Sequence, residues 1–306
     1  AKLGEDKGFA ELWVPEDYFF TGGISGATAA LGATSKVPVG LGIVSAMVRH
    51  PAALAMELST MSRMFPERVW PGIGLGVPFW LRQMGLYPKS QLTAMRECLT
   101  GLRSLHANEN LTREGDYFSF DAVQLTHPPS EEIPLYMGVL GPKMLELSGE
   151  IADGTVVSVL AAPEYVRWLR ERVAAGAAKA GRDASTHRVS TFALFAADSD
   201  SAAAKAAVRP ATSFYLSAMP KSALTDVYGV GDELWEMAQG GQDQIDREMP
   251  DQWLEDLVVA GEPDECAAKF RRLLDAGSDS VVLFPAQPEA FDETVEFAAR
   301  EVLPRV

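Results

Sequence analysis

Short apolar runs alternate with amphipathic segments along most of this chain. Several of the runs are almost continuously apolar, which is typical of parallel strands that are buried on both faces. The segments between them carry apolar residues at helical spacing. Strand–helix alternation of this kind predicts parallel β-α-β units. The seven predicted strands lie at residues 11–14, 37–44, 69–76, 133–140, 154–160, 189–197 and 280–284.

Three of the intervening helices have recognisable starts. Pro51 and Pro263 suit first helical positions, and Ser90 suits a helix N-cap. Gly277 is expected to end the last of these helices. In chain order, the inward faces carry Leu54, Leu58, Met61 and Phe65, then Leu92, Met95, Leu99 and Leu102, then Ala267, Phe270, Leu273 and Leu274.

The pattern favours a (β/α)8 TIM barrel in which residues 1–306 form a single domain. Seven strands are one too few, and residues 1–9 read as the end of a helix, so we expect the first strand to lie upstream of the given sequence. Residues 108–134 predict a loop with a small hairpin, and residues 198–256 predict a helical insertion. A doubly wound open sheet remains the alternative. It needs no missing strand but prefers one dominant phosphate loop.

Two glycine-rich loops follow predicted strands. One runs from Gly72 to Gly76, and its G-x-G-x-G pattern differs from the dinucleotide-binding G-x-G-x-x-G motif. The other contains Gly138, Gly141 and Lys143 at the start of a predicted helix, where free N–H groups and the helix dipole favour an anion. Lys143 is either a partner for that anion or a solvated surface lysine.

Two further groups lie at predicted strand ends. Glu16, Asp17 and Tyr18 follow the first strand, at the barrel face where active sites are built. A helix cap or a surface turn explains them equally well. Phe79 and Trp80 follow the first glycine loop and either stack on a planar ring or pack against the core.

Composition and motif content make several classes of function unexpected. The net charge is −15 and no run is rich in Lys or Arg, so a nucleic-acid partner is not expected. No apolar run is long enough for a bilayer, and the two widely separated cysteines suit helix packing in a reducing cytosol. The four histidines are widely spaced and predict no metal site. No G-x-S-x-G elbow is present, which disfavours a serine hydrolase.

Six motifs in order give the chain a resemblance to the luciferase-like monooxygenases. Residues 8–17 resemble their opening G-F-x-x-x-W-V-x-(E/D)-(D/H), and residues 68–76 resemble their R-x-x-x-G-(I/L)-G-x-G. Residues 141–154 resemble their GP-x-x-L-x-L-(A/S)-GE-x-ADG. The remaining matches are residues 41–44 with 49–52, residues 261–265 and residues 279–283.

The resemblance implies a TIM barrel that binds flavin mononucleotide (FMN) or the deazaflavin coenzyme F420, and the Gly141-Pro142-Lys143 version is closest to the F420-dependent branch. It implies a non-proline cis peptide at Gly42–Ile43 behind the cofactor ring. The cofactor-binding residues that we expect are Asp17, Gly42, Ile43, Val44, Val77, Trp80, Gly138, Leu140, Gly141, Pro142, Lys143 and Ser158.

Three departures separate the chain from the branch that oxidises sugar phosphates. Tyr18 replaces a catalytic His, Val77 replaces a catalytic Glu, and Ala161 replaces a substrate-binding Lys. Valine exchanges no proton, so we expect hydride transfer between F420 and a small organic substrate that is not a sugar phosphate. Tyr18 is the candidate catalytic donor.

Two other functions stay open: an FMN-dependent monooxygenase, and a non-catalytic flavin-binding protein that Val77 favours. The cysteine usage suggests a cytoplasmic protein, and the resemblance suggests a homodimer as its possible assembly.

Overall fold

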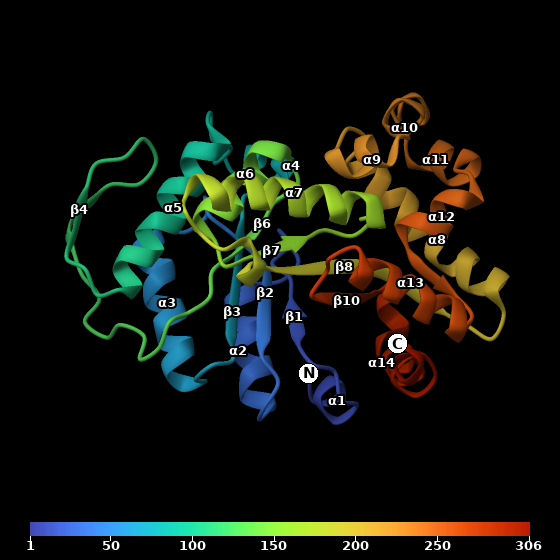
Figure 1. Cartoon of the computed structure of the whole chain (residues 1–306), viewed down its shortest axis with the longest axis horizontal. Coiled ribbons are helices and arrows are strands. Elements are labelled where there is room, and N and C mark those ends of the chain that lie inside the picture. Colours follow the sequence, from blue (N-terminus) through green and yellow to red (C-terminus); the bar gives the residue numbers. More distant parts are fainter. The chain divides into compact units, whose positions relative to one another are not determined.

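Parallel strands and the helices between them make up most of the structure, a computed structural model that describes residues 1–306 (Figure 1). The chain folds as two units. The first comprises Ala1–Val139, Glu146–Val156 and Val173–His187. The second comprises Leu140–Leu145, Val157–Arg172 and Arg188–Val306. Each unit is described below by itself.

The sheet of the first unit has the order β1-β2-β3-β6-β7, with every neighbouring pair parallel. These strands confirm the first five that the hydrophobic pattern predicts, although most are shorter than expected. Parallel pairing brings their carboxyl ends to one edge of the sheet, where the loops that follow them gather. The strands are β1 (Leu12–Val14), β2 (Val39–Ser45), β3 (Val69–Gly74), β6 (Tyr136–Gly138) and β7 (Gly154–Val157).

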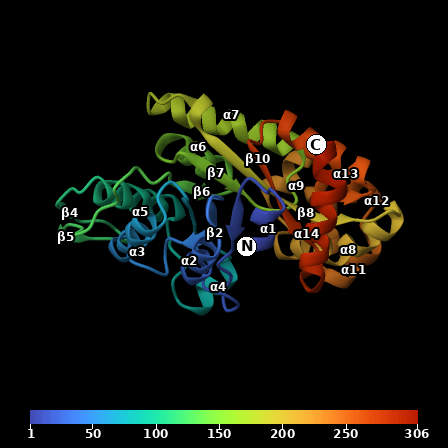
Figure 2. The ribbon, with the colours of Figure 1, turned by 90° about the horizontal axis from the view of Figure 1, so that it is seen from below.

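The helices of this unit begin where the sequence indicates. His50 caps α3 by accepting a hydrogen bond from Ala52 N, and Ser90 caps α5 by accepting one from Thr93 N. Figure 2 shows α3 and α5 side by side, and their buried faces hold the predicted Leu54, Leu58, Leu99 and Leu102. The helices are α1 (Lys2–Asp6), α2 (Gly23–Ala33), α3 (Pro51–Met64), α4 (Pro78–Gln83) and α5 (Gln91–His106), together with α6 (Pro142–Ile151) from Glu146 onward.

The predicted hairpin is confirmed. Strands β4 (Leu111–Arg113) and β5 (Phe120–Val123) pair antiparallel. The turn between them is held by Glu97 of α5, whose carboxylate accepts hydrogen bonds of 2.9–3.0 Å from the N–H groups of three successive residues, Asp116, Tyr117 and Phe118.

In the second unit, β10 (Ser280–Pro285) and β9 (Val259–Gly261) both pair parallel with β8 (Arg188–Ala197). The pattern predicts β8 and β10 but misses β9. The predicted insertion is helical from α8 to α12. The helices are α7 (Pro163–Lys179), α8 (Ser201–Ala218), α9 (Ala223–Tyr228), α10 (Gly231–Ala238), α11 (Gln242–Glu248), α12 (Asp251–Leu257), α13 (Pro263–Asp275) and α14 (Phe291–Phe297).

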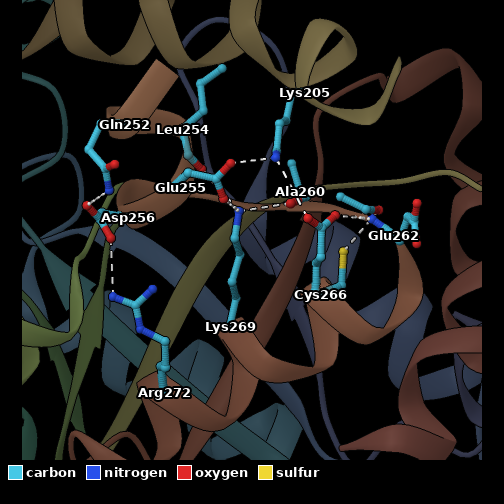
Figure 3. Close-up of polar contacts among 12 residues, drawn as sticks. Lys205, Gln252, Leu254, Glu255, Asp256, Ala260, Glu262, Cys266, Lys269 and Arg272 are labelled. Atoms are coloured by element: carbon cyan, nitrogen blue, oxygen red, sulfur yellow. Dashed lines mark hydrogen bonds and ion pairs between the residues drawn. The ribbon is translucent and has the colours of Figure 1, made fainter. Parts of the chain in front are cut away.

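A network of ion pairs joins four elements of the second unit (Figure 3). Buried Lys269 of α13 donates to Ala260 O of β9 at 2.9 Å and to Leu254 O of α12 at 3.4 Å. Its ammonium also lies 2.9 Å from Glu255, which pairs in turn with Lys205 of α8. Every charge in this network has a partner, so we assign it a structural role.

None of the helices combines the length and the apolar composition that a bilayer span requires.

Candidate active site

An ion pair between buried Glu16 and half-buried Arg49 forms beyond the ends of β1 and β2. Glu16 follows β1, and Arg49 precedes α3. The guanidinium of Arg49 donates two hydrogen bonds of 2.7 Å, one to each carboxylate oxygen of Glu16, whose side chain is only 1% exposed. Glu16 also accepts a bond of 3.1 Å from Gly23 N at the start of α2. Bidentate geometry and the added N–H group hold this carboxylate in one position.

The electrostatics of Glu16 follow from these contacts. Burial alone would raise its pKa, but the hydrogen bonds from Arg49 and Tyr18 and the charge of Arg49 outweigh burial, and the pKa is lowered. Glu16 is therefore a carboxylate at neutral pH.

Tyr18 points its hydroxyl at this carboxylate. Its Oη donates to Glu16 Oε1 at 2.8 Å, and burial, followed by that hydrogen bond, raises the pKa of the phenol. The ring packs edge-on against Trp80 of α4, with 6.4 Å between centroids. A phenol has one proton to donate, and Tyr18 gives it to Glu16.

Asp17 lies between these two residues but makes different contacts. Its carbonyl accepts bonds from Phe20 N at 2.7 Å and Thr21 N at 3.2 Å, which form a tight turn. Its half-buried carboxyl takes part in none of the hydrogen bonds around Glu16. Burial and then the adjacent charge of Glu16 raise the pKa of Asp17.

The peptide bond between Gly42 and Ile43 is cis, as the resemblance implies. At this point the pairing of β2 with β3 skips Ile43, because Gly42 lies opposite Gly72 and Val44 opposite Ile73. The Ile43 side chain occupies the space that three glycines leave on the neighbouring strands. A Cβ atom on Gly74 or Gly138 would approach Ile43 side-chain atoms too closely, and one on Gly72 would clash with Leu41 O and lie tightly against Ile43.

This packing gives a different reason for part of the glycine pattern. We expected the glycines of residues 72–76 to admit a cofactor ring. Instead, Gly72 and Gly74 make room for Ile43 and for neighbouring backbone atoms. Gly138, which we assigned to the phosphate loop, also borders Ile43. The side chain of Val44 is fully buried and lies near Gly23 at the start of α2, so only its backbone remains for a ligand.

Aromatic side chains surround Tyr18 and Trp80. The ring of Phe20 lies 6.2 Å from that of Trp80, and Phe19, Phe20 and Phe79 are 61–82% exposed. Val77 caps the start of α4 and is 40% exposed. The segments 18–23 and 74–81 contain no charged residue. This surface suits an uncharged ligand.

The remaining predicted residues belong to the second unit. Leu140 O accepts a hydrogen bond of 2.8 Å from Tyr165 Oη, which fixes the loop before α6. No atom lies within 4 Å of the position of a Cβ on Gly141, and Lys143 is exposed in the first turn of α6. Pro142 begins this helix, whose first internal bond runs from Leu145 N to Gly141 O. Ser158 follows β7 and is half-buried.

The structure thus brings Asp17, Tyr18 and Trp80 together in the first unit. It also brings Ile43 to Gly138 through the pairing of β2, β3 and β6. Sequence reasoning missed Glu16 and Arg49 as the charges that hold Tyr18. The sequence does place an acidic residue after one predicted strand and an arginine after the next, and this pattern could have indicated the ion pair.

Known proteins resemble this chain over nearly its whole length. A family model described as luciferase-like monooxygenase matches residues 1–280. The 5,10-methylenetetrahydromethanopterin reductase of Methanolobus tindarius is 28% identical over 309 residues, which cover 99% of this chain and 94% of that protein. The F420-dependent glucose-6-phosphate dehydrogenase of Nakamurella multipartita is 27% identical, over 100% of this chain and 91% of that protein.

Among solved structures, the coenzyme F420-dependent tetrahydromethanopterin reductase of Methanopyrus kandleri superposes with a TM-score of 0.86. The match covers 99% of this chain and 93% of that one, at 26% identity. The chain therefore has the TIM-barrel type of fold that the sequence predicts.

Proposed function

The chain belongs to the luciferase-like monooxygenase family, and within it we propose an F420-dependent oxidoreductase that transfers a hydride to or from a small uncharged substrate. The observation that carries this proposal is the full-length similarity to proteins named as F420-dependent enzymes and reductases. The deazaflavin, when bound, supplies the ring carbon that gives or takes the hydride.

The residues present fit such a cofactor. The uncharged side chains of Ile43, Val77 and Trp80 suit a planar ring. At the start of α6, the first N–H groups make no bond within the helix, Gly141 presents no side chain, and Lys143 adds a positive charge. These are the features that a phosphate group requires. The first set of residues, in the first unit, suits a ring, and the second set, which also includes Pro142 and Ser158 of the second unit, suits a phosphate group.

The substrate class follows from the charges near Tyr18. Arg49 is the cation beside it, and both of its terminal nitrogens bond Glu16 while its Nε lies 3.5 Å from Glu57. The charge of Arg49 is therefore balanced by the carboxylates of Glu16 and Glu57, which disfavours a substrate phosphate at this position. The aromatic rings of Tyr18, Phe20 and Trp80 instead favour an apolar ketone or enone.

A cofactor titration tests this proposal. We expect F420 to bind the purified protein with a lower Kd than FMN, and reduced F420 to be oxidised by a cyclic enone such as 2-cyclohexen-1-one but not by gluconolactone 6-phosphate. Tight binding of FMN alone would instead indicate a flavin monooxygenase. Binding of F420 without hydride transfer to any ketone or enone would indicate a non-catalytic protein.

A pair of variants tests the substrate surface. Trp80→Ala removes the ring that contacts Tyr18 and Phe20 and should raise KM for the enone about fivefold, the effect of losing one aromatic contact of about 1 kcal/mol. Phe214→Ala is the matched control, because this ring of α8 is 53% exposed and its ring contact is with Tyr215, not with Tyr18 or Phe20.

A further inference from the structure

Two neighbouring carboxyl groups at the end of β1 have opposite surroundings. Glu16 is fixed by Arg49, by Gly23 N and by the hydroxyl of Tyr18. The carboxyl of Asp17 shares none of these donors and is half-buried beside the Glu16 charge. One group is therefore committed as a carboxylate, while the other is free to hold a proton and to exchange it.

Tyr18 is a poor proton donor in this arrangement. Its hydroxyl hydrogen lies in the bond to Glu16 Oε1, which leaves the oxygen with acceptor capacity only. Donation to a substrate would leave a buried carboxylate without one of its hydrogen bonds. Val77 has no proton to give. Asp17 is the remaining ionisable group among these residues.

We propose that the Asp17 carboxyl is the catalytic acid and base of the hydride transfer, a role that rests on the proposed function. In the reducing direction, the hydride forms a C–H bond at the substrate carbonyl carbon. The π electron pair of the C=O bond moves to oxygen, and the proton of the Asp17 carboxyl forms the new O–H bond. The substrate gains two electrons that the cofactor loses, and Asp17 regains its proton from water. In the oxidising direction, the Asp17 carboxylate takes the alcohol proton.

The charges around Asp17 support this role. Burial disfavours its ionised form, and the Glu16 carboxylate next to it adds repulsion, so the pKa of Asp17 is raised. Arg49 and Glu57 act on Asp17 through Glu16, because Arg49 binds Glu16 directly and Glu57 contacts Arg49. Two adjacent carboxyls whose pKa values are pushed apart are the usual arrangement for separate acid and structural roles. Glu16 is thus a positioning residue.

Carboxyl titration tests the proposal without turnover. Carbon-13 NMR of the full-length protein labelled at aspartate, with and without F420, should show one carboxyl that titrates above the ordinary aspartate pKa of about 3.9 and that disappears in Asp17→Asn. In Glu16→Gln the same signal should titrate at lower pH, because the neighbouring negative charge is gone. An Asp17 signal at the ordinary value would overturn the proposal, whatever the rates.

Kinetics with reduced F420 and 2-cyclohexen-1-one provide the second test. Asp17→Asn should lower kcat about 10²- to 10⁴-fold and remove the limb of the pH–rate profile that Asp17 sets, with kcat measured at saturating F420 because Asp17 is also an expected cofactor-binding residue. Tyr18→Phe should keep that limb, since its hydroxyl donates to Glu16. A wild-type pH profile in Asp17→Asn, or loss of the limb in Tyr18→Phe alone, would refute the role of Asp17.

The two proposals fail in different ways. If the wild-type protein transfers no hydride, the proposed function fails. Where it does transfer hydride, the carboxyl titration and the two variants decide the role of Asp17.

Discussion

The side chain of Ile43 on β2 fills the space that Gly138 leaves on β6. A Cβ on Gly138 would overlap Cγ2 of Ile43, and the three atoms nearest to that position all belong to the Ile43 side chain. The two residues are far apart in sequence and lie on strands that do not pair directly, since β3 lies between them. Their fit couples the cis peptide segment to the strand that leads into the second glycine loop.

This fit predicts that Gly138→Ala destabilises the protein by about 1–3 kcal/mol through overpacking. Urea denaturation would measure the change. In the double-mutant cycle with Ile43→Ala, the alanine at 138 should cost less, because the clashing methyl group is gone. Gly141→Ala is the control, since no atom lies within 4 Å of its Cβ position. Equal losses at 138 and 141 would contradict the prediction.

Lys269 provides a prediction for the second unit (Figure 3). Lys269→Met keeps the length of the side chain but removes the donor to the carbonyls of Leu254 and Ala260 and the partner of Glu255. We expect a loss of about 1–3 kcal/mol, because buried acceptors are left without a hydrogen bond. Differential scanning calorimetry and urea denaturation would measure it.

The matched control is Lys179→Met. Lys179 also forms an ion pair, with Glu146, but its side chain is 57% exposed. A pair of this kind contributes about 0–1 kcal/mol. Should the two variants lose the same stability, the Lys269 network would have to be regarded as an ordinary surface cluster.

Much of the fold could be read from the sequence. The apolar runs that became β2, β3 and β8 are long and β-branched or glycine-rich, and helix starts such as Ser90 carry their capping residue beside them. Strand β9 was missed because it has only three residues and follows a polar helical stretch, so no periodicity marks it. Its pairing with β8 decides its conformation, and that contact is invisible along the chain.

The candidate site was less predictable for the same reason. Asp17, Tyr18 and the Gly42–Ile43 bond could be proposed because each lies within a local motif. The Arg49–Glu16 pair joins residues 33 positions apart, and nothing near Glu16 indicates its partner. The role of Gly138 depends on a side chain two strands away. Local sequence therefore gave the candidate groups, while their hydrogen bonds and pKa shifts required the tertiary contacts.

His106 predicts a pH dependence of stability. Burial, with a smaller effect of Arg103, lowers its pKa to about 4. The ordinary histidine pKa is about 6.5. Between pH 6.5 and 4, His106 is therefore protonated in the unfolded chain but neutral in the folded protein. The contribution of His106 is therefore fully present above pH 6.5 and is lost as the pH falls toward 4, by about 1–3 kcal/mol in total.

Urea denaturation at a series of pH values would measure this loss, and nitrogen-15 NMR of the imidazoles would show which histidine titrates near 4. In His106→Gln the stability curve should be flatter between pH 6.5 and 4, because the titrating ring is absent. A His106 ring that titrates near 6.5 in the folded protein would exclude this explanation.

The two cysteines predict a contrast in thiol reactivity. Cys98 of α5 and Cys266 of α13 are free and fully buried, and burial raises the pKa of each thiol to about 12. Only the thiolate attacks a disulfide reagent, so at pH 8 the native protein should react with an aromatic disulfide far more slowly than an exposed thiol.

In guanidinium chloride both cysteines should react promptly. Ala29→Cys places a thiol on the exposed face of α2 and serves as the positive control. Prompt native reaction of either wild-type cysteine would show that α5 or α13 opens to solvent, and would contradict the packing role that we assign to both residues.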